Sequence, residues 1–153
     1  CERAHSRRTQ GTLLAEKGTV QAMLADSQIE LESFRLLVIK TAWIIDNSHG
    51  DPRKARAHIA MVKVAMAKIY YDIVRRAIHL HGSLGATFET PLAYMWQNVP
   101  TMGLADGPTE VHQITVAREL LRKYKPAEGL FPSEHLPPKI EAAKARYAHI
   151  FND

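Results

Sequence analysis

The stretch DPRKARAHIAMVKVAMAKIYYDIVRRAIHLHGSLG, residues 51–85, decides the fold. Its apolar side chains recur mostly at three- and four-residue steps, and its basic side chains lie mostly between them. Asp51 is placed to cap the first turn, and Pro52 suits the first helical position. Two glycines three residues apart, Gly82 and Gly85, favour a tight turn over continued helix. We therefore expect one amphipathic helix of roughly 45 Å, at about 1.5 Å per residue.

The flanking segments predict further helices. An amphipathic pattern over 19–46 ends at a group of turn-forming residues, 47–50, and a short helix is expected from Pro91 to Val99, stopped by Pro100. Another helix is expected from Asp106, and a last one over 139–151. For the helix that begins at Asp106 we expect a buried stripe of Val111, Ile114, Ala117, Leu121 and Tyr124.

No strand pattern, repeat or low-complexity tract is found in the sequence. Long helices joined by short turns predict an all-α fold, an up-and-down four-helix bundle with an additional C-terminal helix. We expect one domain over 1–153, with an initial segment at 1–16 and a C-terminal strap and helix at 126–153.

Composition excludes several classes of protein. The chain has 153 residues, of which 46% are hydrophobic and 24% charged, as in an ordinary globular protein. Its net charge of +4 comes from basic residues scattered among almost as many acidic ones, which is a poor pattern for nucleic-acid binding. Cys1 is the single cysteine, so no internal disulfide or Cys-rich zinc site is possible. No apolar run approaches the roughly 20 residues of a membrane span. We expect an intracellular protein, of which this chain is a fragment that starts mid-protein.

Histidines invite a metal hypothesis that the spacing does not support. Glu2 and His5 have the Glu-x-x-His spacing of metal sites in helical bundles, but such sites need a second copy and further carboxylates on long helices. His79 and His81 lie two apart near the end of a helix, so they point to different faces. We expect no metal.

Two other features remain ambiguous when each is taken alone. Asp106 precedes Gly-Pro-Thr-Glu and is a plausible helix cap. The turn of residues 82–85 lets a ligand approach the backbone closely, but it matches neither of the two common glycine-rich phosphate-binding patterns. Neither feature assigns a function by itself.

Read together, several segments resemble the acyl-CoA dehydrogenase family. Residues 7–11, RRTQG, resemble its R-x-T-F-G element, and 77–85, AIHLHGSLG, resemble A-x-Q-x-x-G-G-x-G. Residues 89–92, ETPL, resemble E-x-P-[VL], and 106–110, DGPTE, resemble E-G-T-S-E/Q. The similarity covers about residues 1–125, and it is specific as an ordered set.

The resemblance implies a C-terminal helical domain of a larger enzyme. This domain would bind FAD and an acyl-CoA thioester jointly with the other domains of that enzyme. The resemblance implies α,β-dehydrogenation to a trans-2-enoyl-CoA, with Asp106 as the general base and Gly107 at the substrate. It implies a cofactor-binding set of Arg7, Thr9, His79, Gly82, Ser83, Pro108 and Glu110, of which Arg7 and Thr9 would meet the FAD pyrophosphate of a neighbouring subunit.

The resemblance also implies a homodimer or homotetramer, and an electron-transferring flavoprotein as acceptor. A mitochondrial or peroxisomal location would follow for a eukaryote, and a cytoplasmic one for a bacterium. The acyl chain length and its branching are left open, because the pocket walls would lie largely in other domains.

Four positions depart from the family pattern. Asp106 stands for the usual Glu and reaches about 1.5 Å less, while Pro108 replaces a Thr and loses its hydroxyl and amide donors. Ser83 replaces a glycine, and residues 96–98, WQN, replace Y-R-D. The motif with aspartate at position 106 resembles that of a sub-branch of the acyl-CoA dehydrogenase family, in which some members are fused to a kinase-like domain. A dehydrogenase is the favoured hypothesis, and a non-catalytic helical oligomerisation module is the alternative.

Overall fold

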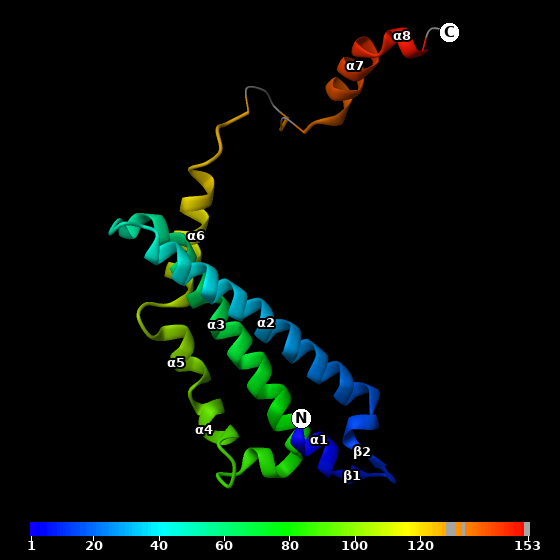
Figure 1. Ribbon diagram of the computed structural model, residues 1–153, viewed down its shortest axis with the longest axis vertical. Helices are drawn as coiled ribbons and strands as arrows, with labels where there is room; N and C mark the ends of the chain where they lie inside the picture. Colours follow the sequence, from blue (N-terminus) through cyan, green and yellow to red (C-terminus); the bar gives the residue numbers. More distant parts are fainter. Residues whose placement is uncertain (128–130, 133, 152–153) are drawn as a thin grey trace. The chain divides into compact units, whose positions relative to one another are not determined.

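The computed structural model describes residues 1–127, 131–132 and 134–151, and the chain divides into two compact units, Cys1–Glu119 and Leu120–Asp153. The first unit is built on two long antiparallel helices, α2 (Gly18–Asp46) and α3 (Pro52–His81), which lie side by side (Figure 1). At the start of α3 the Asp51 carboxylate accepts a hydrogen bond from the Arg53 amide at 3.0 Å. The predicted cap, proline position and helix end are confirmed.

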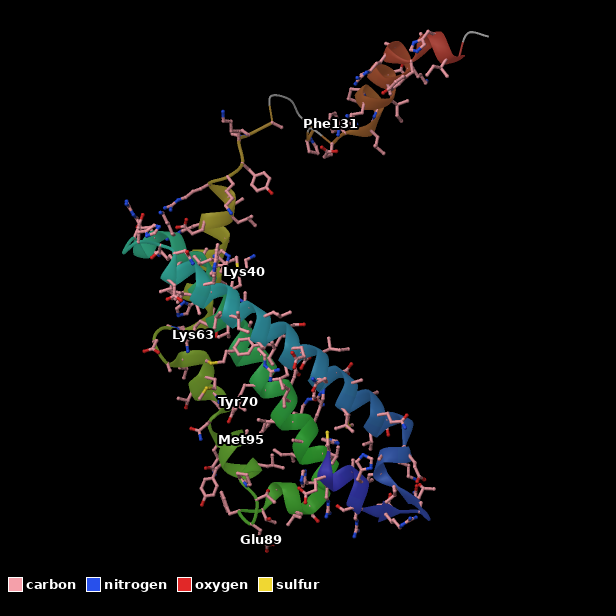
Figure 2. The ribbon with its side chains drawn as sticks, viewed as in Figure 1. Lys40, Lys63, Tyr70, Glu89, Met95 and Phe131 are labelled. Atoms are coloured by element: carbon pink, nitrogen blue, oxygen red, sulfur yellow. The ribbon has the colours of Figure 1, made fainter. Side chains whose placement is uncertain are left out.

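Shorter helices pack along another side of α3. The chain leaves α3 through a 3₁₀ turn, η2 (Gly82–Ala86), and returns as α4 (Leu92–Gln97) and α5 (Val99–Leu104), with α6 (Thr109–Leu121) after it (Figure 1). The hydroxyl of Tyr70 donates to the Met95 carbonyl of α4 at 3.2 Å (Figure 2). The Lys63 ammonium donates to the Met102 carbonyl of α5 at 3.0 Å. The all-α prediction is confirmed. Between α3 and α6 the chain forms two short helices, α4 and α5, where one short helix was predicted.

An ion pair joins the two long helices. Both terminal nitrogens of Arg76 on α3 donate to the Glu30 carboxylate of α2, at 2.7 and 3.0 Å. The side chains are only 13% and 24% exposed, so water screens the pair weakly. The hydrogen bond from Arg76 lowers the pKa of Glu30, against the opposing effect of burial. Because the two hydrogen bonds of such a guanidinium–carboxylate pair need a defined geometry, the pair sets the register of α2 along α3.

Small residues fill the closest contacts of the core. Ala55, Ala60 and Val74 of α3 are buried, as are Val20 and Thr41 of α2. At the end of α3, a Cβ on Gly85 would lie 2.8 Å from the Ile78 carbonyl oxygen. Residue 85 is therefore glycine because the η2 turn folds back directly onto the α3 backbone.

Four sequence predictions are wrong in detail. Pro100 does not stop a helix but lies in the first turn of α5, where the missing amide costs nothing. Two short strands, β1 (Arg8–Thr9) and β2 (Thr12–Leu13), occur where no strand was predicted. The C-terminal helix starts earlier, at Leu136, and divides into α7 (Leu136–Arg146) and α8 (Ala148–Phe151).

The fourth error concerns α6. Its predicted buried stripe is exposed, with Val111 53%, Ile114 50%, Leu121 67% and Tyr124 70% accessible and Ala117 also exposed. The helical period is right, but it indicates only which side chains share a face. It does not show that the face is covered within this chain.

The second unit contains α7 and α8. The Phe131 ring stacks on His135 at 4.2 Å between centroids, and Lys139 pairs with Glu134. Part of the predicted strap, 128–130 and 133, lies outside the described residues. No helix in the described part of the chain is both long and apolar enough to cross a membrane.

The Glu30–Arg76 pair makes stability depend on pH. Because the pKa of Glu30 is lowered by folding, its stabilisation is complete above the ordinary glutamate range and is lost as the pH falls through the folded-state pKa. Glu30→Gln should lower the free energy of unfolding by about 1–2 kcal/mol at neutral pH. It should also flatten the loss of stability that the parent protein shows as the pH falls through and below the ordinary glutamate range.

Urea denaturation of the intact protein at several pH values measures both effects. Glu141→Gln, in an exposed pair with Lys144, is the matched control and should change little. Equal acid sensitivity in Glu30→Gln and the parent protein would contradict the assignment.

Gly85→Ala should destabilise the fold by about 1–3 kcal/mol, because its Cβ meets backbone that cannot move without disturbing α3. Gly18→Ala is the control: nothing lies within 4 Å of its added Cβ. That change should be neutral or slightly stabilising. Thermal unfolding of the two variants checks the difference, and equal melting temperatures would refute the close approach at Gly85.

Candidate active site

The candidate base lies in a tight loop between α5 and α6. Asp106 has a φ of 57° and Gly107 a φ of 107°, so two successive residues adopt left-handed backbone. Aspartate tolerates this region better than most residues with a side chain, and glycine accepts it freely. The reversal turns the chain from the end of α5 into the start of α6.

Three hydrogen bonds hold this loop from different directions. Lys63 of α3 binds the Met102 carbonyl in the last turn of α5, where carbonyls lack helical partners. The Thr109 hydroxyl donates to the Gly103 carbonyl at 3.1 Å, and the His112 Nε2 lies 3.2 Å from the Asp106 carbonyl oxygen. Because a carbonyl oxygen only accepts, His112 must carry its proton on Nε2 to make that bond.

The side chain of Asp106 is left available for chemistry. It is exposed on this chain, and the hydrogen bond between Asp106 and His112 uses the backbone carbonyl of Asp106. Among the described residues no donor binds the Asp106 carboxylate, so the capping interpretation receives no support. The Pro108 carbonyl accepts hydrogen bonds from the Val111 and His112 amides in the first turn of α6, at 3.0 and 3.4 Å.

The residues around Asp106 that were predicted as ligands lie on the same loop and helix start. Glu110 is exposed in the first turn of α6, Pro108 is exposed just before it, and Gly107 is half-buried. Sequence reasoning missed Lys63, Thr109 and His112. Only the repeated i, i+6 spacing of Gly103 with Thr109 and of Asp106 with His112 was visible in the sequence, and Lys63 gave no signal.

Arg7 and Thr9 belong to a hairpin at the other end of α3. Arg7 follows the short helix α1 (Glu2–Ser6), and the turn between β1 and β2 is Gln10–Gly11, with φ values of 52° and 81°. Two positive φ values are typical of the two-residue turns that match strand twist. Arg7 is exposed, and no side chain in the described part of the protein pairs with its guanidinium.

His79, Gly82 and Ser83 lie at this same end of α3. Gly82 has a φ of 65°, and its amide donates to the carbonyls of Ile78 and His79, which ends the helix. His79 lines a cavity of about 420 Å³, which Arg75, Phe88 and Trp96 also line. Ser83 is exposed.

The predicted site residues therefore form two groups, not one. Lys63, which anchors the Asp106 loop, and His79 are 16 residues apart on α3, which is roughly 24 Å along a helix. The loop group contains Asp106, Gly107, Pro108 and Glu110. The hairpin and turn group contains Arg7, Thr9, His79, Gly82 and Ser83. No group of acidic, histidine or cysteine side chains in the described residues could hold a metal ion.

A cavity of about 470 Å³ lies beside the loop group. Arg53 and Arg56 of α3 line it together with His112 and Thr115 of α6. The lining combines the guanidinium groups of Arg53 and Arg56, the first of which also pairs with Asp51, with the apolar side chains of Ile59 and Val111. Such a lining suits an anionic ligand that also carries an apolar part.

Comparisons with known proteins identify relatives of this arrangement. The family model for the acyl-CoA dehydrogenase C-terminal domain matches residues 1–121. A probable acyl-CoA dehydrogenase, FadE2, of Mycobacterium tuberculosis is 40% identical over 123 residues, covering 80% of this chain and 30% of that protein. The (R)-benzylsuccinyl-CoA dehydrogenase of Thauera aromatica is 38% identical, covering 82% of this chain and 31% of that protein.

A solved structure agrees in fold. The structure of a putative acyl-CoA dehydrogenase from Mycobacterium abscessus matches with a TM-score of 0.77 and 35% identity, covering 82% of this chain and 30% of that chain. The chain thus spans about 30% of the length of each of these relatives.

Lys63→Met should loosen the Asp106 loop, because the Met102 carbonyl loses its charged donor while the apolar stem is kept. Hydrogen exchange of the amides of residues 103–107 and 109 should become about tenfold faster, while exchange of the α2 amides stays unchanged. Lys54→Met, at an exposed position on the same helix, is the control. Unchanged exchange in the loop of Lys63→Met would show that this contact does not hold it.

Proposed function

Because the chain belongs to the acyl-CoA dehydrogenase family, we propose that it supplies the catalytic base of a flavin-dependent acyl-CoA dehydrogenase. The observation that carries the proposal is the exposed Asp106 carboxylate on a loop that is held by hydrogen bonds from α3 and from α6, to the main chain of the loop and of the end of α5. A base must stay within reach of one substrate proton, and a fixed main chain holds it there. The proposed domain occupies residues 1–153, with an initial segment at 1–16 and a strap and helix at 126–153, and the family match supports it over residues 1–121.

The reaction proposed is α,β-dehydrogenation of an acyl-CoA thioester. The Asp106 carboxylate accepts the α-proton, the β-hydrogen leaves with its electron pair, and the product is the trans-2-enoyl thioester. When bound, FAD supplies the two-electron acceptor for that hydride. Since Asp106 is one methylene shorter than glutamate, the substrate α-carbon must lie about 1.5 Å closer to its backbone than a glutamate would require.

The residues at the far end of α3 fit a dinucleotide cofactor. Arg7 offers a fork of donors that no side chain in the described residues binds, and Thr9, two residues later in β1, adds a hydroxyl. At Gly82 an added Cβ would meet nothing within 4 Å, so the backbone there is open to a ligand. We assign Arg7, Thr9, His79, Gly82 and Ser83 to this role.

The remaining assignments lie beside the base. Pro108 and Glu110 are assigned to the cofactor side of the loop, and Gly107 to the substrate. Lys63, which anchors the loop group, and His79 of the other group lie roughly 24 Å apart along α3. This separation supports contact of the two groups with different cofactor molecules, as in a homodimer or homotetramer. An electron-transferring flavoprotein is the proposed acceptor, in the β-oxidation of fatty acids or of related acyl groups.

A non-catalytic helical oligomerisation module is the second candidate. The exposed apolar side chains of α2 and α6 favour it, because a soluble protein rarely leaves such faces open. It predicts that the intact protein does not reduce flavin with any acyl-CoA.

Asp106→Asn tests the favoured candidate. In the intact protein this variant should keep its yellow FAD, since the carboxylate is not part of the cofactor cradle, but acyl-CoA should fail to bleach it. We expect flavin reduction to slow by at least about a thousandfold, because the amide cannot accept the proton. Asp46→Asn, at the exposed end of α2, is the matched control.

Stopped-flow absorbance of the flavin gives the readout. Normal bleaching of Asp106→Asn would remove Asp106 from the mechanism. Failure of the parent protein to bleach with acyl-CoA thioesters of several chain lengths would favour the non-catalytic candidate.

A further inference from the structure

The loop that carries Asp106 contains a β-turn with an uncommon residue at its third position. The Gly107 amide donates to the Leu104 carbonyl at 3.2 Å, which closes a turn over residues 104–107. Ala105 has a φ of −57° and a ψ of 137°, and Asp106 has a φ of 57°, as in a type II turn. The third position of such a turn requires a positive φ, so it normally holds glycine or asparagine. Here it holds an aspartate.

The turn places Asp106 in a backbone conformation that its side chain disfavours. For a residue with a side chain, a positive φ brings Cβ too close to a backbone carbonyl oxygen, and aspartate is only better tolerated than most. Residues strained in this way persist where their surroundings hold them, and they are common at functional sites. The contacts around the turn must therefore keep Asp106 at its positive φ.

His112 makes the side-chain contact that acts on Asp106 directly. Its Nε2 lies 3.2 Å from the Asp106 carbonyl oxygen. The carbonyl of Asp106 and the amide of Gly107 belong to one peptide unit, so His112 and Leu104 hold this unit at both ends. The imidazole also lies against the turn, because a Cβ built on Gly107 would be 3.4 Å from Nε2.

A contact that fixes the Asp106 carbonyl also fixes the direction of its side chain. Cβ and the carbonyl carbon are bonded to the same Cα. With the preceding peptide held in place, rotation about the N–Cα bond therefore turns both through the same angle. Such a rotation of Asp106 to a negative φ would swing the carboxylate and break the bond to His112. Lys63 and Thr109 bind carbonyls of α5, so they leave this rotation free.

We propose that His112 is a positioning residue, which keeps Asp106 at its positive φ and thereby directs its carboxylate. The proposal rests on the proposed function, in which that carboxylate accepts the substrate proton. The imidazole takes no proton in the reaction and acts only through the Asp106 backbone. Loss of the bond should lower the fraction of molecules whose carboxylate faces the substrate, while the affinity for substrate stays the same.

Two amide variants of the intact protein test the role of Nε2. In His112→Gln the amide nitrogen is three bonds from Cβ, as Nε2 is in histidine, so it can donate to the same carbonyl. In His112→Asn the nitrogen is only two bonds from Cβ and falls short. His112→Leu removes the donor altogether.

We expect the limiting rate of flavin reduction by acyl-CoA to separate these variants. It should stay within about threefold of the parent rate in His112→Gln and fall about tenfold in His112→Asn and His112→Leu. A tenfold fall corresponds to about 1.4 kcal/mol, the size of one hydrogen bond. The acyl-CoA concentration at half-saturation should stay unchanged. Stopped-flow absorbance of the flavin measures both quantities.

Two further measurements complete the test. Gln113→Leu, exposed in the same turn of α6, is the matched control and should keep the parent rate. Hydrogen exchange of the Gly107 amide needs no turnover, because that amide closes the turn. Its exchange should become about tenfold faster in His112→Asn and His112→Leu, and stay near the parent value in His112→Gln.

The outcomes separate this role from the proposed function. If Asp106→Asn fails to bleach but His112→Asn reduces flavin at the parent rate, the positioning role is overturned and Asp106 remains the base. Equal slowing in His112→Gln and His112→Asn, or rates that follow the melting temperatures, would show that His112 only stabilises the start of α6 and would also overturn it. Normal bleaching of Asp106→Asn overturns the proposed function, and the role of His112 with it.

Discussion

The hydrogen bond from the Lys63 ammonium to the Met102 carbonyl is the constraint on which the candidate site depends. It joins the longest helix of the described chain to the last turn of α5, four residues before Asp106. A short helix such as α5 is marginal by itself, so its end is placed mainly by what it contacts. Thr109 and His112 then fix the loop from the α6 side. The position of the carboxylate is therefore determined by α3 as much as by its own loop.

Helix α3 carries the other elements of the first unit in the same way. Arg76 fixes α2, Tyr70 fixes α4, and the α3 backbone at Ile78 receives Gly85 of η2. Two sets of candidate site residues are consequently held at points roughly 24 Å apart on one rigid helix. In the proposed enzyme this separation means that neither set forms a complete site alone, so catalysis and assembly are linked.

The helices were predictable because their signals are local. Periodicity, the Asp51–Pro52 start and the glycines at 82 and 85 determine α3 almost to the residue. Pro100 misled the prediction because proline disrupts a helix interior but suits a first turn, and the sequence alone does not distinguish the two. The hairpin at 8–13 was missed because two-residue strands are too short to show alternation, although Gln10–Gly11 was a turn signal.

The site was predictable only as a set of matched positions. Asp106, Arg7 and His79 were found through motifs, but the contacts that hold the loop join residues up to 39 positions apart. No sequence period links Lys63 to Met102. The exposure of the apolar stripes was also not predictable. A helical stripe such as that of α6, or of α2 at Ile29, has the same sequence pattern whether it packs against this chain or against another part of the protein.

A crystal structure of the intact protein with a non-reducible acyl-CoA analogue tests the central claim most directly. The account predicts an Asp106 carboxylate oxygen about 3–3.5 Å from the carbon that corresponds to the substrate α-carbon, with the Lys63–Met102 contact in place. An analogue bound with another carboxylate at that carbon, and Asp106 directed away from it, would contradict the account.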